Sequence, residues 1–100
     1  MRHYMLIYHY ADDYLARRGE VRGEHLTKAW AAVDKGEMVL GGALEPPEQT
    51  GMILFRSDNK SAAEEFARND PYVLKGIVKA WRVAEWLTVV GHDAAAPVGR

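Results

Sequence analysis

Two stretches decide how this chain is expected to fold: Arg68-Asn69-Asp70-Pro71-Tyr72-Val73 and, far upstream, Val21-Arg22-Gly23-Glu24-His25-Leu26. The proline of the first stretch stops the helix that leads into it, because proline lacks the amide proton that a continuing helix needs. The second stretch lies where another helix begins. Together they carry a carboxylate and an imidazole, so the spatial relation between these two helix ends matters most for function.

Apolar spacing predicts two helices. The first runs from about Arg22 to Lys35, where apolar residues recur at helical spacing and Gly36 follows at a typical helix C-terminus. The second runs from Ser61 to about Asn69, and Ser61 with Glu64 matches a capping box. The recurring apolar residues of the first helix are Leu26, Trp30 and Val33, with Ala29 and Ala32 beside them. The expected buried stripe of the second helix is Ala63, Phe66 and Ala67.

Runs of branched and aromatic residues predict four strands. A turn with two prolines separates the second strand from the third. Gly41 and Gly42 interrupt the second strand, which permits close approach of a ligand or of another backbone. The predicted strands are residues 3–10, 38–44, 52–56 and 77–90.

The resulting order, βαββαβ, is that of a ferredoxin-like α+β sandwich, in which two helices cover one face of a four-stranded antiparallel sheet. Residues 1–90 are expected to form this domain, and residues 91–100 a C-terminal tail. Right-handed crossovers bring the start of the first helix, the end of the second and the end of the first strand to one edge. We therefore expect His25 and Asp70 to lie close together, with Tyr8 nearby.

The first and last strands are apolar on both faces, although the helices of this fold cover only one face. The uncovered face is expected to pack against a second copy of the chain, so the sequence predicts a homodimer. A domain of this size also buries only about two thirds of its unfolded surface, and a partner would add to that burial.

Composition disfavours several classes of function. With 13 basic and 14 acidic residues, a net charge of -1 and no basic block, nucleic acid is not an expected partner. The chain has no cysteine, and His3 and His9 lie roughly 20 Å apart on one strand, so we expect no metal or other cofactor. No apolar run is long enough for a signal sequence or a membrane span, so a cytoplasmic protein without membrane contact is expected.

His25 and Asp70 are the candidate catalytic residues. The positive end of the helix dipole disfavours an imidazolium at His25 and leaves a neutral nitrogen that can accept a proton, while Asp70 could orient the ring. Both residues have a structural alternative. Aspartate before proline is a typical N-cap of a short turn, and a lone histidine on a helix is often an ordinary core or surface residue.

Four further residues are candidates for substrate binding. Of the three arginines between positions 17 and 22, we select Arg22 as a ligand for an anionic group, with solvated surface charge as the alternative. Tyr8 and Tyr72 lie near the predicted edge, with core or interface packing as their alternative. Gly42 belongs to the glycine pair of the second strand.

Several motifs resemble the YCII-related (YciI-like) family of the dimeric α/β barrel superfamily. The most specific is Asp-Pro-Tyr, beginning at Asp70, paired with Arg-x-x-His-Leu, beginning at Arg22. The resemblance extends from the first strand to Trp86, and it also includes Leu40-Gly41-Gly42-Ala43-Leu44 and Gly76.

This resemblance implies a ferredoxin-like dimer with an active site at His25 and Asp70, and it includes one enzymatic relative, a dehydrochlorinase of a chlorinated hydroxyhydroquinone. Many members carry proline where this chain has Ala43, so the wall of the pocket is expected to differ there.

Two functions are compatible with these residues. The first is a cofactor-free lyase or isomerase that moves a proton on a small cyclic or aromatic compound. The alternative is a non-catalytic dimeric protein that binds a small ligand in the same pocket.

Overall fold

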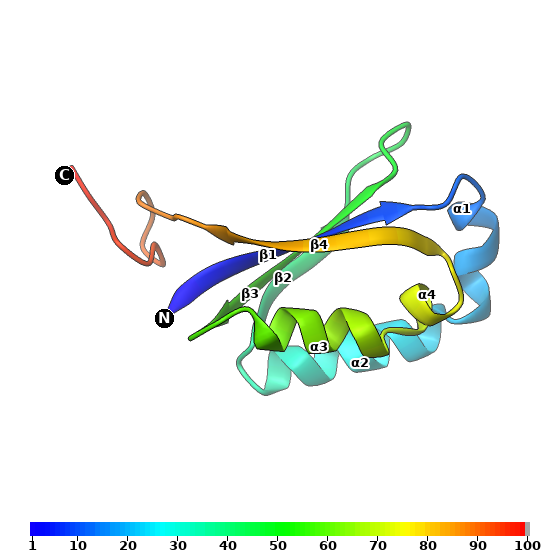
Figure 1. Ribbon diagram of the computed structural model, residues 1–100, viewed down its shortest axis with the longest axis horizontal. Helices are drawn as coiled ribbons and strands as arrows, with labels where there is room; N and C mark the ends of the chain where they lie inside the picture. Colours follow the sequence, from blue (N-terminus) through cyan, green and yellow to red (C-terminus); the bar gives the residue numbers. More distant parts are fainter. Residues whose placement is uncertain (100) are drawn as a thin grey trace.

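The computed structural model describes residues 1–99 and contains a four-stranded antiparallel sheet with the strand order β2-β3-β1-β4. The helices lie against one face of this sheet (Figure 1), as the ferredoxin-like prediction requires. No helix within residues 1–99 has the length and apolar character needed to cross a membrane. The elements are β1 Arg2–Tyr10, α1 Tyr14–Arg17, the 3-10 helix η1 Arg18–Glu20, α2 Arg22–Asp34, β2 Met38–Ala43, β3 Thr50–Ser57, α3 Ser61–Asn69, α4 Pro71–Leu74 and β4 Val78–Trp86.

The core lies between the sheet and the helices. Alternate residues of β1 are buried toward the helices, because successive side chains of a strand point to opposite faces. Phe55 of β3 packs against Phe66 of α3, with ring centroids 5.6 Å apart. The predicted stripe of α3 is confirmed, since Ala63, Phe66 and Ala67 are all buried.

The apolar spacing of α2 does not mark its buried residue. Ala32 is the buried residue of this helix, whereas Leu26 is exposed and Trp30 retains 65% of its accessible surface. The physical reason is that α2 lies over β2, the edge strand of the sheet, and a pocket separates the two elements. The apolar stripe of α2 therefore faces this pocket.

Two local predictions also differ from the structure. The capping box of α3 does not form, because Asn59 accepts the hydrogen bond from the Ser61 amide at 2.9 Å and Lys60 occupies the N-cap. The last strand ends at Trp86, earlier than predicted. The following segment folds back on itself, with hydrogen bonds from the Ala96 and Val98 amides to the Thr88 and Val89 carbonyls.

No helix of residues 1–99 covers the second face of the sheet (Figure 1). In the register of β1 and β3, Tyr8 is opposite Gly51 on the helix-covered face. The intervening positions, Met5 opposite Leu54 and Ile7 opposite Met52, therefore lie on the open face.

Candidate active site

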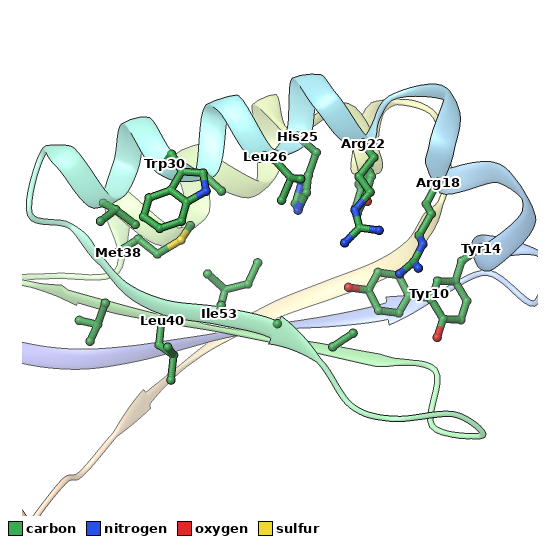
Figure 2. Close-up of a pocket in the computed structure, with 17 residues that line it drawn as sticks. Tyr10, Tyr14, Arg18, Arg22, His25, Leu26, Trp30, Met38, Leu40 and Ile53 are labelled. Carbon is green, nitrogen blue, oxygen red and sulfur yellow. The ribbon is translucent and has the colours of Figure 1, made fainter.

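A pocket of about 400 Å³ lies between α2 and the β2 edge of the sheet (Figure 2). One of its ends is rich in tyrosine and arginine, and the rest is largely apolar. Its lining residues are Tyr10, Tyr14, Arg18, Arg22, His25, Leu26, Ala29, Trp30, Val33, Met38, Val39, Leu40, Gly41, Gly42, Ala43, Ile53 and Tyr72.

Asp70 sits beside this pocket in the short connection between α3 and α4. Its backbone is extended, with φ -71° and ψ 126°, and its side chain is completely buried. Carboxylate oxygen Oδ1 accepts a hydrogen bond from the Tyr72 amide at 3.0 Å, so Asp70 is the N-cap of α4 and Pro71 is its first residue. The structural role considered for Asp70 is therefore present in the fold.

Tyr8 supports Asp70 from the sheet. It points from the middle of the sheet toward the helices, is completely buried, and donates its hydroxyl hydrogen bond to Asp70 Oδ2 at 2.6 Å. Burial raises the pKa of Tyr8, and the adjacent Asp70 carboxylate raises it further, so the hydroxyl stays a donor. Tyr8 is not among the pocket-lining residues, and its hydroxyl contacts Asp70.

His25 completes the cluster from the first turns of α2. Its Nδ1 lies 2.8 Å from Asp70 Oδ1 and 2.9 Å from Oδ2, although the two residues are 45 positions apart in the sequence. The imidazole stacks on the Tyr72 ring, with centroids 3.8 Å apart and planes at 5°. These contacts hold the ring in one orientation, and Figure 2 shows it pointing from α2 into the pocket.

The hydrogen bonds around Asp70 determine how His25 can act. The Tyr8 hydroxyl and the Tyr72 amide both donate to the carboxylate. An ionised carboxylate, which only accepts hydrogen bonds, fits this arrangement. The remaining contact then requires a proton on Nδ1 of His25. A neutral His25 held in this tautomer has its lone pair on Nε2, as a general base needs.

Two tyrosines at the polar end, Tyr10 and Tyr72, have raised pKa values. Burial raises the pKa of Tyr10 to about 12 and also raises that of Tyr72, although Arg22 and Arg18 oppose the effect on Tyr72. Tyr10 stacks on Tyr14 with ring centroids 4.4 Å apart. Gly51 makes room for this pair, since a Cβ at that position would lie 2.9 Å from Cζ of Tyr10.

Of the other predicted binding residues, Arg22, Gly42 and Tyr72 line the pocket. Sequence reasoning did not select Arg18 or Trp30, which line it as well. The apolar stripe that contains Trp30 was a usable signal for that residue. Arg18 belongs to η1 and Arg22 to α2, so the spacing of the two arginines along the chain gave no such signal.

Arg17, the third arginine of the group, lies outside the pocket: it pairs with Asp13 at 3.8 Å and donates to the Lys75 carbonyl at 2.6 Å. Among residues 1–99, no three histidine, cysteine or acidic side chains are grouped as metal ligands would be.

The fold and this cluster define a ferredoxin-like α+β domain in which a buried aspartate orients a pocket histidine. The family model of the YCII-related domain matches residues 1–87, so the chain belongs to this family. A search of curated proteins found no relative that matches this sequence.

Solved structures share the fold at low sequence identity. The 5-chloro-2-hydroxyhydroquinone dehydrochlorinase of Burkholderia phenoliruptrix AC1100, in complex with 2,5-dihydroxybenzoquinone, is 16% identical with a TM-score of 0.73, over 86% of this chain and 94% of that one. A structural-genomics protein of Agrobacterium tumefaciens is 11% identical with a TM-score of 0.59, over 95% and 98%. A NIPSNAP family protein of the same species is 10% identical with a TM-score of 0.56, over 93% and 95%.

Proposed function

We propose that this protein is a small enzyme of the lyase or isomerase type, in which His25 takes a proton from a small cyclic or aromatic compound bound in the pocket. Asp70 orients the imidazole, and Tyr8 orients Asp70. Arg22, Gly42 and Tyr72 contact the substrate. No step of this proposal requires a cofactor.

One observation carries the proposal. The His25 side chain is 14% exposed and lines a pocket, while the carboxylate that binds its Nδ1 is completely buried. A general base needs this asymmetry, because the orienting group must be protected from water and the accepting nitrogen must be free to reach substrate. The fold shared with a dehydrochlorinase of an aromatic compound is compatible with such chemistry.

A metabolite screen by thermal shift, followed by turnover measurements on each stabilising compound, tests this function. We expect turnover of at least one cyclic or aromatic compound, and we expect His25→Ala to lower it by roughly 10²–10⁴-fold, the usual contribution of a general base. His92→Ala changes an exposed histidine of the C-terminal segment and serves as the matched control. Turnover that survives in His25→Ala would rule out this role for His25.

The alternative is a non-catalytic protein that binds a small ligand in the same pocket. It is favoured by the double role of Asp70, which caps α4 in addition to binding His25. Saturable stabilisation by a compound that is never converted, with equal affinity in the wild type and in His25→Ala, is the result that would favour this function.

We also propose that the protein is a homodimer that packs the open faces of two sheets together. The apolar positions Met5, Ile7, Met52 and Leu54 lie on this face, which has no helix over it in the described residues. Neighbouring apolar side chains on a sheet face are expected to be covered, because leaving them in water forfeits their hydrophobic free energy.

A charge on this face should prevent association. We expect the wild type to sediment as a dimer at micromolar concentration, and we expect Met52→Glu to weaken association by more than about tenfold, because an unpaired carboxylate would be buried in the interface. Leu74→Glu, which changes an exposed apolar residue of α4, is the control and should stay dimeric. A monomeric wild type would contradict the proposal.

A further inference from the structure

Two arginines stand at one end of the pocket without a carboxylate beside them. Arg18 and Arg22 both line the pocket, and its lining contains no aspartate or glutamate. Within residues 1–99, the arginines that have a carboxylate oxygen within 4.0 Å are Arg2, Arg17 and Arg68. The two pocket guanidinium groups therefore have no protein counter-charge in contact.

The positive charges of Arg18 and Arg22 act on the same part of the pocket. Both groups oppose the rise in the pKa of Tyr72 that burial causes, so both act at the same phenol. Figure 2 shows the two side chains reaching from the helical segments toward the sheet, on the Tyr10 side of the cavity. Two guanidinium groups at the same end of a pocket are suited to binding a planar oxyanion.

The other end of the pocket is apolar. Leu26, Trp30, Met38 and Ile53 line it and offer no charged group. Trp30 is largely exposed at this end, so the apolar end is open to solvent. His25 lies between the arginines and Trp30 along α2 (Figure 2).

We propose that the ligand of this pocket is a planar acid, whose carboxylate or equally compact oxyanion is bound by Arg18 and Arg22 together. Its ring or apolar body lies toward Met38 and Trp30. This inference rests on the proposed function and deepens it, because it defines the class and the orientation of the ligand. In this orientation, His25 meets the atoms next to the acidic group.

Paired probes test the inference without knowledge of the natural substrate. We would titrate the protein with benzoate and phenylacetate, and separately with their neutral amides, benzamide and phenylacetamide. The readout is the change in the ¹H–¹⁵N signals of Gly41 and Gly42, which line the pocket. We expect each acid to bind at least about tenfold tighter than its amide, since a hydrogen bond to a charged group is stronger than one to a neutral group.

Variants separate this inference from the catalytic proposal. Arg18→Gln and Arg22→Gln should each weaken binding of the acids by about tenfold or more and leave the amides unaffected. Arg68→Gln removes an equal charge from the exposed surface of α3 and should change neither. His25→Ala should still bind the acids, because the two arginines hold them. If the wild-type protein binds the acids but converts none of the screened compounds, this inference is supported and only the catalytic role is contradicted.

Three results would each overturn the inference. In the first, acids and amides bind equally well, and in the second, acids leave the Gly41 and Gly42 signals unchanged at millimolar concentration. Acid affinity that is unaltered in Arg18→Gln and in Arg22→Gln would overturn it as well.

Discussion

Asp70→Asn should abolish most His25-dependent turnover while the protein stays folded. Asparagine can still accept the hydrogen bond from the Tyr72 amide, so the cap of α4 is kept. Its NH₂ group takes the place of Oδ2, 2.9 Å from Nδ1 of His25, and presents a donor to that nitrogen where the carboxylate presents an acceptor. The imidazole then favours the tautomer that carries its proton on Nε2, and the lone pair no longer faces the pocket.

The expected loss of turnover is on the order of 10²–10⁴-fold, as for other bases held in the wrong tautomer. The tautomer itself can be measured without a substrate. Long-range ¹H–¹⁵N spectra of the imidazole should show Nδ1–H in the wild type and Nε2–H in Asp70→Asn. Asp34→Asn, which changes an exposed acid at the end of α2, is the matched control and should alter neither property. Full turnover in Asp70→Asn would show that His25 is not oriented by Asp70.

Asp70→Ala should instead destabilise the whole domain. The substitution removes the acceptor of the Tyr8 hydroxyl and of the Tyr72 amide, and both of these donors are buried. Leaving buried donors unpaired and deleting a helix cap together cost on the order of 3–5 kcal/mol of the free energy of unfolding. For a chain of this length, we expect the melting temperature to fall by well over about 10 °C.

A double-mutant cycle identifies the source of this loss. Tyr8→Phe removes the hydroxyl that Asp70→Ala leaves unpaired, so the double variant should be more stable than the sum of the two single losses predicts, by about 1–2 kcal/mol. The measurement is urea unfolding at a single protein concentration, because association would stabilise the folded state. A loss below about 1 kcal/mol in Asp70→Ala would contradict the buried network as a source of stability.

The two Asp70 variants distinguish positioning from stability. Asparagine keeps the structural hydrogen bond and loses the orientation of His25, whereas alanine loses both. If turnover fell in Asp70→Ala and stayed at the wild-type level in Asp70→Asn, Asp70 would affect turnover only by stabilising the fold.

Local sequence patterns determined the elements of this protein and the position of its helix ends. Periodicity separated strands from helices, and Pro71 marked the break at which Asp70 sits, because these signals depend on a few neighbouring residues. Chain direction then brought His25 and Asp70 to the same edge, since the handedness of crossovers leaves few ways to connect four strands and two helices. The family motifs indicated the same two residues.

Only the tertiary structure decided what surrounds this pair. An apolar stripe indicates which side of α2 points inward, but it carries no information about the distance from α2 to the edge strand β2. That distance turns the stripe of Leu26 and Trp30 into the wall of a pocket. Likewise, strand alternation puts Tyr8 on the inner face, and three-dimensional packing places its hydroxyl in contact with Asp70. The stretch around Asp70 therefore determined where the site lies, and the spacing of the layers decided which side chains a ligand can reach.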